Sequence, residues 1–272
     1  MPISLPVNPR ESVRTNIPRV TVSSIADLLA CPRKFYETRI MRNWNQDSPN
    51  DNLERGKALH AVLRDLYNLR TDGTIPLDRL EVIVDRNVRR TNYSPDADKE
   101  NERRRVMTMA DAFVRADDWE DIAGTIGVEK SIEYDLLSQG KALIKFSARL
   151  DRVLVRESAP QTLIIRDYKS GAIKMDLAEV YVILRAAKHQ WPDYKTYILE
   201  LDGLSSDDRI VRETVDYEEC REMHDYFRTR AVEVLEAGYR ANTWPACEGA
   251  CCVYCSLRES CLGLAPDEIN NF

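Results

Sequence analysis

The sequence lacks any long apolar run. No stretch of it approaches the ~18 apolar residues that a membrane-spanning helix requires. The first twenty residues, MPISLPVNPRESVRTNIPRV, also lack the apolar core of a secretory signal peptide. We therefore expect a cytoplasmic protein with no membrane partner.

The sequence also lacks an excess of positive charge. Its 39 Lys and Arg residues against 45 Asp and Glu residues leave a net charge of -6 at pH 7. This balance argues against a surface coated with basic residues and leaves room only for a localised nucleic-acid groove. The candidate cations for such a groove are Arg33, Lys34, Arg103, Arg104 and Arg105. Runs of charge are equally typical of a solvated helix face.

No internal repeat, low-complexity segment or linker divides the 272 residues, which are enough for one large domain. We expect a flexible tail over residues 1–20 and a single domain over residues 21–272. Within that domain we expect a helical region at about 53–120, a sheet at about 126–170 and a cysteine cluster at 247–261.

Hydrophobic periodicity predicts helices, then a small sheet, then helices, which together describe an α/β domain. Helices are predicted at Ser24–Cys31, from Pro32 onward, and at Leu53–Leu69, Leu77–Arg90, Glu102–Trp119, Asp176–Lys188 and Gln190–Leu201, with a last one ending near Glu236. Strands are predicted at Ile126–Leu136, Ala142–Val155, Leu163–Asp167 and Arg209–Tyr217.

Two carboxylates and a lysine fall at the ends of predicted strands. Asp151 ends the polar face of one strand, and Asp167-Tyr168-Lys169 ends the next. Adjacent strands would bring the carboxylates within a few ångströms of each other, and a period of two puts Asp167 and Lys169 on one face. Such carboxylates repel each other unless a cation lies between them, and oxygen ligands suit Mg²⁺ or Mn²⁺. A neighbouring lysine can orient a water and stabilise charge on a phosphate. The pattern indicates metal-assisted phosphodiester hydrolysis, although a solvated rim is also made of such residues.

The seven cysteines are unevenly distributed. Five of them lie within fifteen residues, at Cys247, Cys251, Cys252, Cys255 and Cys261, whereas Cys31 and Cys220 stand apart. In a reducing compartment such a group binds a metal or an iron–sulfur cluster more often than it forms disulfides. Tetrahedral thiolate ligation suits both Zn²⁺ and [4Fe–4S], so the spacing leaves both open. Cys220 falls in a predicted helix and is expected to be a buried thiol.

Five segments carry a family resemblance by their order. They are TVSSIADLLACPRKFYETRI at 21–40, GKALH at Gly56–His60, SARLDRVLV with LIIRDYKSG, QWPDY at Gln190–Tyr194, and the cysteine group. In this order they resemble the RecB-like, iron–sulfur branch of the PD-(D/E)XK nuclease superfamily, typified by the CRISPR-associated adaptation exonuclease and AddB-type nuclease domains. The resemblance covers about residues 21–262. It implies a restriction-endonuclease-like core, namely a small mixed sheet flanked by helices, with an N-terminal helical region and a C-terminal iron–sulfur clasp.

The resemblance assigns roles to individual residues. It implies a Mn²⁺ or Mg²⁺ site held by His60, Asp151, Asp167 and the backbone carbonyl of Tyr168. Asp151, Asp167 and Lys169 are the catalytic residues that it implies. Gly56, one turn before His60, would leave room for a close approach at this site.

The same resemblance implies that Gln190 and Tyr194, of a Q-x-x-x-Y motif, bind the substrate. Four apart on a predicted helix, they would share a face that contacts DNA or braces the site. A hydrogen-bonded helix-packing pair is the alternative. Pro192 lies between them and is tolerated only in a first helical turn, which predicts that this helix begins near Gln190. A second departure from the family is the stretch before Asp151, which has no glycine where one is common.

A [4Fe–4S] cluster is the implied cofactor of the cysteines. Cys252, Cys255 and Cys261 give C-x2-C-x5-C, and the resemblance joins them to Cys31, so that the cluster clasps the two chain ends. Cys247 or Cys251 could take the place of Cys252. The role expected for the cluster is structural.

The function implied is a metal-dependent DNA exonuclease that acts on single-stranded DNA or DNA ends in CRISPR adaptation, recombination or repair. Its partners would be DNA and either a CRISPR integrase or a recombination partner, and a homo-oligomer is compatible with this activity. A phage-encoded enzyme would act in the host cytoplasm. The alternatives are a catalytically silent DNA-binding or assembly module with the same fold and cluster, and a zinc-stabilised interaction domain. The intact set of His60, Asp151, Asp167 and Lys169 favours the enzyme.

Overall fold

The structure is a computed structural model, and it describes residues 18–42, 50–71, 73–95, 97–138, 141–171, 173, 175–204, 210–241, 243–247, 252, 255, 257 and 261. The chain forms two compact units. Unit 1 comprises Met1–Gln46, Glu133–Ala148 and Glu222–Phe272, and unit 2 comprises Asp47–Ile132 and Arg149–Arg221. The chain therefore passes repeatedly between the units, and the expectation of a single domain over residues 21–272 stays a prediction.

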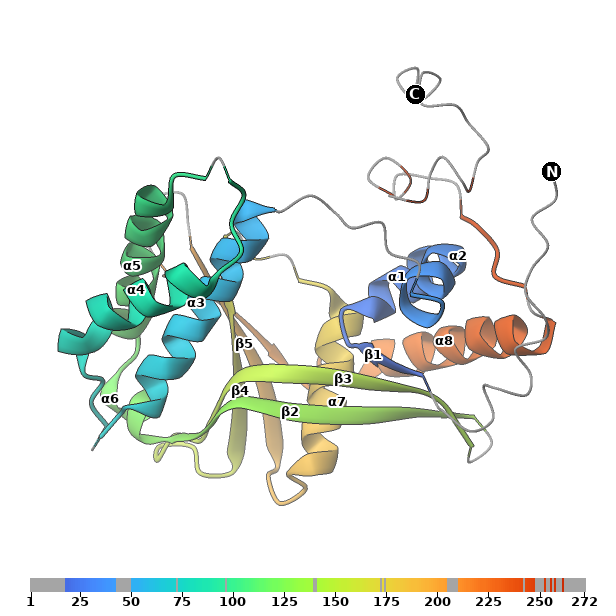
Figure 1. The fold of residues 1–272 in the computed structure, drawn as a ribbon. Coiled ribbons are helices and arrows are strands. Elements are labelled where there is room, and N and C mark those ends of the chain that lie inside the picture. Colours follow the sequence, from blue (N-terminus) through green and yellow to red (C-terminus); the bar gives the residue numbers. More distant parts are fainter. Residues whose placement is uncertain are drawn as a thin grey trace. The chain divides into compact units, whose positions relative to one another are not determined.

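A mixed sheet of six strands is flanked by helices, as predicted for a restriction-endonuclease-like core (Figure 1). The strands are β1 (Arg19–Thr21), β2 (Thr125–Ser138), β3 (Lys141–Leu154), β4 (Thr162–Lys169), β5 (Thr196–Leu204) and β6 (Ile210–Asp216). Their order is β1-β3-β4-β5-β6, and β2 pairs with β3. β3 and β4 are antiparallel, β4 and β5 are parallel, and β5 and β6 are antiparallel.

The first strand was not predicted. Arg19 and Val20 fall within the expected tail, yet β1 pairs in parallel with Lys145–Ser147 of β3. Val20 is buried, and the main-chain N–H of Val22 continues the pairing by donating to the carbonyl of Ser147 at 2.9 Å. Residues 1–17 of the expected tail lie outside the described residues.

The helices of unit 2, except α4, begin at side-chain caps. They are α3 (Asp51–Asn68), α4 (Leu80–Arg90, preceded by the short 3-10 turn Leu77–Arg79), α5 (Lys99–Ala116), α6 (Trp119–Ala123) and α7 (Leu177–Gln190). Asn50, Asp98 and Asp176 each accept hydrogen bonds from first-turn N–H groups of the helix that follows. Helices α3, α4 and α5 lie side by side (Figure 1) and share one hydrophobic core, in which the predicted stripe of Leu59, Leu63 and Leu66 is fully buried.

Unit 1 contains α1 (Ser24–Ala30), α2 (Pro32–Phe35), the π-helical turn Tyr36–Ile40 and, apart from its first residue, α8 (Arg221–Ala241). Trp244 joins these elements, because its ring stacks on Tyr36 at 4.9 Å between centroids and meets the Tyr239 ring edge-on at 5.6 Å. Gly238 permits this approach, since a Cβ there would lie 2.5 Å from the Trp244 ring. An indole thereby anchors the end of α8 to the N-terminal helices.

The helix predicted over Gln190–Leu201 is wrong. Helix α7 ends at Gln190, and the apolar run that follows is β5, between β4 and β6 in the sheet. Pro192 cannot donate a main-chain hydrogen bond, and it lies in the turn that ends the helix rather than in a new first turn. The run from Thr196 to Leu201 is rich in aromatic and branched residues, whose side chains pack well in strands.

The helix predicted over Glu102–Trp119 is two helices. The first helix, α5, ends before Asp117, and Asp118 caps α6 by accepting a hydrogen bond from the N–H of Asp121 at 2.7 Å.

None of the helices that the structure describes has the length and hydropathy of a membrane-crossing segment.

We expect Trp244→Ala to lower the stability of the protein by about 3–5 kcal/mol, because a buried aromatic side chain is replaced by a cavity. Thermal and chemical unfolding measure the loss. Trp119→Ala is the matched control, since that indole is 61% exposed and its removal should cost far less. Equal losses in the two variants would show that Trp244 does not anchor the end of α8.

Candidate active site

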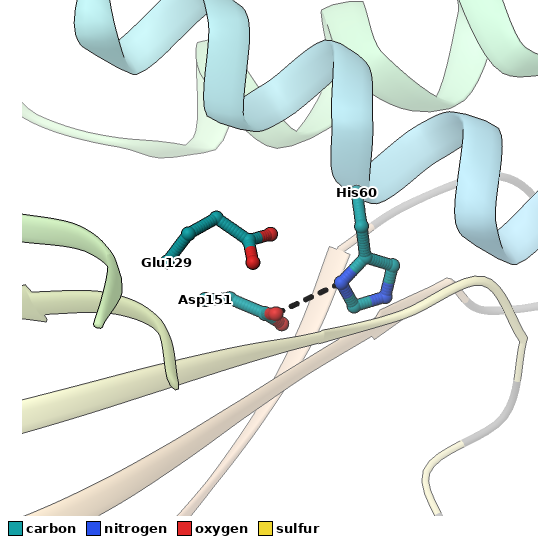
Figure 2. A group of neighbouring side chains, drawn as sticks. All are labelled: His60, Glu129 and Asp151. Carbon is teal, nitrogen blue, oxygen red and sulfur yellow. Dashed lines mark hydrogen bonds and ion pairs between the residues drawn. The ribbon is translucent and has the colours of Figure 1, made fainter. Parts of the chain in front are cut away.

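The predicted metal ligands His60 and Asp151 are in direct contact. Helix α3 places His60 Nδ1 2.9 Å from Asp151 Oδ1 of β3 (Figure 2). The other oxygen of Asp151, Oδ2, accepts a hydrogen bond of 2.8 Å from the main-chain N–H of Tyr168 on β4. Asp151 is therefore oriented by two neighbouring elements. Although desolvation acts to lower it, the pKa of His60 is raised by the hydrogen bond that the imidazole donates to Asp151.

Asp167 and Lys169 share one face of β4, as predicted, and form an ion pair. Lys169 Nζ lies 2.7 Å from Asp167 Oδ2. Burial, followed by the charge of Asp151, raises the pKa of Asp167 to about 6, against the opposing effect of Lys169. For Lys169, desolvation acts to lower the pKa, but Asp167 and then Glu179 of α7 raise it above its ordinary value. The lysine is thus held in its charged form beside a carboxylate that resists ionisation.

Glu129 of β2 joins the site and was missed by the sequence analysis. One ligand atom each from Glu129, His60 and Asp151 lies within 4.8 Å of the other two (Figure 2). Glu129 has a φ of 53°, a left-handed backbone that is uncommon for a residue with a side chain and is found most often at functional sites. Burial, followed by repulsion from Asp151, raises its pKa, although Arg149 opposes this.

No sequence signal distinguished Glu129 from other acidic residues of the same strand. Glu133 and Asp135 have the same period-two parity, but both pair with Lys145 of β3. Only the left-handed backbone at Glu129 interrupts the regular alternation, and that conformation is not encoded by a glycine. The sequence therefore offered three equivalent acids where the structure distinguishes one.

The donor set of the site fits a divalent cation. Glu129 Oε2 and Asp167 Oδ2 are buried and receive no hydrogen bond of regular geometry from the residues described, although Arg149 and Lys169 lie beside them. Buried carboxylates that are not fully hydrogen-bonded are costly, and a bound cation lowers that cost. Three carboxylates with one imidazole are ligands suited to Mg²⁺ or Mn²⁺.

Gly56 lets α3 approach the end of β4, as expected from the sequence. A Cβ at this position would lie 3.3 Å from Ser170 Oγ, a tight contact directly after Lys169. Tyr168 is buried, and its ring stacks on Tyr67 of α3 at 6.2 Å between centroids. The role expected for the Tyr168 carbonyl, that of a metal ligand, stays a prediction.

Gln190 and Tyr194 do not share a helical face. Gln190 is the last residue of α7, and Tyr194 lies in the turn that leads into β5. The expectation that they lie four residues apart on one helix is therefore wrong, because α7 ends at Gln190 and Pro192 lies in the turn that follows. Their expected contact with substrate stays a prediction.

The predicted cations of a basic groove are mostly neutralised. Lys34 pairs with Asp27 and Arg33 with Glu37, both at 2.7 Å. In unit 2, ion pairs join Arg103 to Glu81 and Asp85, and Arg105 to Glu102. The reading of these runs as solvated helix faces is favoured, because four of the five charges already have acidic partners.

The four cysteines that the resemblance assigns to a cluster interact electrostatically in unit 1. Burial first, then Cys31, and to a lesser extent Cys255 and Cys252, raise the pKa of the Cys261 thiol. Cys31 is buried at the N-terminus of α2, where its Sγ accepts from the N–H of Lys34 at 3.5 Å. Cys251 lies outside the described residues.

Cys220 is a buried thiol, as predicted, although it lies in the turn before α8 rather than in a helix. Burial raises the pKa of this thiol to about 11. A thiol so reluctant to ionise is a poor metal ligand, because metals bind the thiolate.

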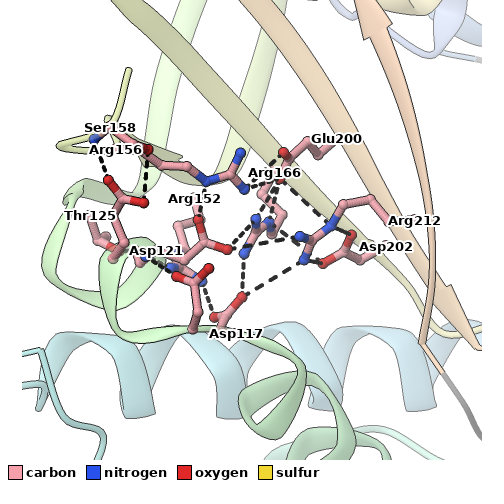
Figure 3. Close-up of polar contacts among 12 residues, drawn as sticks. Asp117, Asp121, Thr125, Arg152, Arg156, Ser158, Arg166, Glu200, Asp202 and Arg212 are labelled. Atoms are coloured by element: carbon pink, nitrogen blue, oxygen red, sulfur yellow. Dashed lines mark hydrogen bonds and ion pairs between the residues drawn. The ribbon is translucent and has the colours of Figure 1, made fainter. Parts of the chain in front are cut away.

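A buried ionic network lies beside the catalytic strands (Figure 3). Arg152 and Arg166 are fully buried cross-strand partners on β3 and β4, next in sequence to Asp151 and Asp167. Like charges placed opposite each other repel, and the two carboxylate oxygens of Asp117 resolve this by pairing with one arginine each. Tyr67 also donates its hydroxyl hydrogen bond to Asp117.

The network balances its charges. It contains four arginines and four carboxylates, namely Arg152, Arg156, Arg166 and Arg212 with Asp117, Asp121, Glu200 and Asp202. Desolvation acts to raise the pKa of Asp121, but Arg156 and Arg166 lower it to about 2. The burial of Arg152 could have been predicted from the sequence, because period two places it on the apolar face of Ile144, Phe146, Ala148 and Leu150.

Asp117→Asn should cost about 3–5 kcal/mol of stability, because it leaves two buried guanidinium groups facing each other with their shared charge partner lost. Chemical denaturation measures the change. Asp111→Asn is the matched control, since its partner Arg115 lies on an exposed helix face and the pair should contribute only about 0.3–0.5 kcal/mol. Similar losses in the two variants would contradict the bridging role of Asp117.

Three comparisons with known proteins bear on this site. A family model described as "PD-(D/E)XK nuclease superfamily" matches residues 19–262 of the chain. Among curated proteins no sequence matches. The span of the family match includes His60, Glu129, Asp151, Asp167 and Lys169.

Among solved structures, the chain is similar to a protein from Eubacterium rectale named "Putative exonuclease", with a TM-score of 0.57 and 11% identity. That match covers 92% of this chain and 90% of the other, and at such low identity it shows a shared fold. A second structure, named "SSO0001", is 12% identical over 95% of this chain and 92% of its own, with a TM-score of 0.37 that carries no argument. On the family match over most of its length, the chain belongs to the PD-(D/E)XK nuclease superfamily.

Proposed function

We propose that this protein is a divalent-metal-dependent DNA exonuclease. The observation that carries the proposal is the convergence of two carboxylates and a lysine, Asp151, Asp167 and Lys169, from adjacent strands of a nuclease-family fold. Metal dependence is supported by the grouping of possible ligand atoms from His60, Glu129 and Asp151 within 4.8 Å of one another.

His60, Glu129, Asp151 and Asp167 are the residues that would hold Mg²⁺ or Mn²⁺. When bound, such an ion polarises a phosphoryl oxygen and lowers the pKa of a coordinated water. Asp151 is preorganised for this role by the hydrogen bonds at both of its oxygens. Electrostatic repulsion between Asp151 and Asp167, which raises the pKa of Asp167, is relieved when a cation lies between them.

Lys169 supplies positive charge where the phosphodiester reacts. Its ammonium group is held by Asp167 and kept protonated by the surrounding carboxylates. In that state it orients the attacking water and stabilises the negative charge that develops on the phosphate. No other lysine lies against these carboxylates in the part of the chain that the structure describes.

DNA as substrate, with attack at single strands or ends, is supported by the family resemblance of the ordered motifs. The same resemblance supports a setting in CRISPR adaptation, recombination or repair, with an integrase or a recombination partner. The paired state of most predicted groove cations favours a local contact with a few phosphates over a broad basic surface.

A [4Fe–4S] cluster held by Cys31, Cys252, Cys255 and Cys261 forms part of this proposal. Its support is the electrostatic effect of Cys31, Cys255 and Cys252 on the Cys261 thiol. The group would link α2 to the C-terminal segment, where the main-chain N–H of Arg33 already donates to the carbonyl of Pro245 at 3.1 Å. A structural role follows, because thiolates from both chain ends would bind one group.

We expect wild-type protein to degrade end-labelled DNA with Mn²⁺ or Mg²⁺, and Lys169→Ala to lose at least 100-fold in rate, since transition-state charge stabilisation of this kind is worth about 10²–10³. Single- and double-stranded substrates labelled at either end also report polarity. Lys145→Ala is the control, because this β3 lysine pairs with Glu133 and Asp135 instead. A wild-type protein that binds DNA without cleaving it would replace the proposal with the catalytically silent module.

Cys31→Ala should remove the brown colour and the iron, and should lower the melting temperature, because one of four ligands and the link between the chain ends are lost. Iron and zinc analysis with thermal unfolding measures both effects. Cys220→Ala is the control, a buried thiol outside the set that should keep its iron. Full iron content with unchanged melting in Cys31→Ala would contradict the ligand assignment, and a colourless zinc protein would replace the cluster with Zn²⁺.

A further inference from the structure

Arg149 borders the candidate active site, and the mechanism described above does not use it. It lies on β3 two residues before Asp151, so its side chain belongs to the same face of the strand. Its Nε pairs with Glu129 Oε2, and Glu129 itself lies against His60 and Asp151. Arg149 is therefore attached to the rim of the carboxylate cluster.

The guanidinium of Arg149 is the most accessible cation around these carboxylates. Its side chain is 66% exposed, compared with 35% for Lys169 and 36% for Arg64, which also acts on Glu129. Arg64 is held by its neighbour Asp65 through both Nε and a terminal nitrogen. Arg149 alone of the three presents its charge mainly to solvent.

Glu129 is the one acidic partner of Arg149 among the residues that the structure describes. A guanidinium carries five N–H donors, and the closest contact with Glu129 is made by Nε. One carboxylate cannot occupy all five donors, so Arg149 retains donors for a second anion. The buried Arg166 provides the contrast, because Asp117, Asp121 and Glu200 surround it. A guanidinium held by one carboxylate and otherwise exposed is preoriented for binding a phosphate.

The site has an electrostatic need for such a group. Glu129, Asp151 and Asp167 face the position where a polyanionic strand must approach, with Glu179 of α7 nearby. Lys169 is held by Asp167 and is assigned above to the reacting phosphate, so it does not also serve a neighbouring phosphate. A substrate phosphate therefore requires a further cation that is near the carboxylates and open to solvent, and Arg149 meets both conditions.

We propose that Arg149 binds a phosphate of the substrate strand adjacent to the scissile phosphate, with its guanidinium oriented by Glu129. This inference rests on the proposed nuclease function and names a substrate contact for the same site. The charge of Arg149 is then shared between Glu129 and the phosphate, which binds the remaining donors. The contact anchors the strand beside the metal ligands without reading its bases.

The test is DNA binding under conditions that prevent cleavage. A fluorescent single-stranded oligonucleotide is titrated with protein in Ca²⁺ at several salt concentrations. Arg149→Gln should weaken binding by about 10- to 100-fold, because hydrogen bonds to charged groups are lost. The slope of log affinity against log salt should also fall in magnitude by about 0.7, the value for one phosphate contact on a single strand.

Arg115→Gln is the matched control. Arg115 is 65% exposed and its Nε contacts an acidic partner, Asp111, at 2.7 Å, as Arg149 contacts Glu129, but it lies on α5, a helix that carries none of the candidate metal ligands. Its replacement should leave both affinity and salt slope at wild-type values. A loss equal to that of Arg149→Gln would overturn the proposal by showing a general effect of surface charge.

Arg149→Lys separates a phosphate contact from a structural effect. Lysine keeps the charge and loses the fork, so the salt slope should stay at the wild-type value while the affinity falls. A slope reduced as far as in Arg149→Gln would overturn the proposal, because the charge is still present. This variant also decides the question if Arg149→Gln does not fold.

The outcomes distinguish this inference from the proposed function. Wild-type protein that cleaves DNA, with an Arg149→Gln variant that binds with wild-type affinity and slope, overturns the phosphate contact alone. Wild-type protein that neither binds nor cleaves DNA overturns the nuclease proposal and the contact with it.

Discussion

The candidate site depends on the buried carboxylate of Asp117, which bridges two arginines. Arg152 and Arg166 stand opposite each other on β3 and β4 without access to water, and Asp117 offsets their repulsion because it pairs with both. Asp151 and Asp167 are the next residues on the same two strands. The bridge between the arginines therefore lies directly beside the two carboxylates of the candidate site.

Along β3 and β4, the charges of Arg152 and Arg166 are arranged differently from those of their neighbours Asp151 and Asp167. Arg152 and Arg166 belong to a buried network in which guanidinium and carboxylate groups are equal in number, so that it needs no external ion. Glu129, Asp151 and Asp167 instead form a group of carboxylates in which burial and the charge of Asp151 raise the pKa values of Glu129 and Asp167. Such a group is suited to a divalent cation, whereas the balanced network next to it is not.

The errors of sequence reasoning have identifiable physical causes. Residues Thr196–Leu201 were assigned to a helix because a four-residue spacing suited Gln190 and Tyr194, whereas Pro192 ends α7 and the sheet takes the apolar run as β5. Glu129 was overlooked because the sequence does not distinguish it from Glu133 and Asp135, and the left-handed backbone that sets it apart is visible only in the structure. The cations at Arg33, Lys34 and Arg103 suggested a groove, but their acidic partners are distant in sequence or on a neighbouring turn.

Local periodicity and motif order determined by themselves most of the helices, four of the six strands and the grouping of Asp151, Asp167 and Lys169, because these follow from spacings of two and of 3.6 residues. Only the tertiary structure decided which acid of β2 joins His60, how Asp117 balances Arg152 and Arg166, and which arginine stays open beside the site. Such contacts join residues 20 to 91 positions apart. Their energies depend on burial and on charge partners, and neither is encoded in the local pattern.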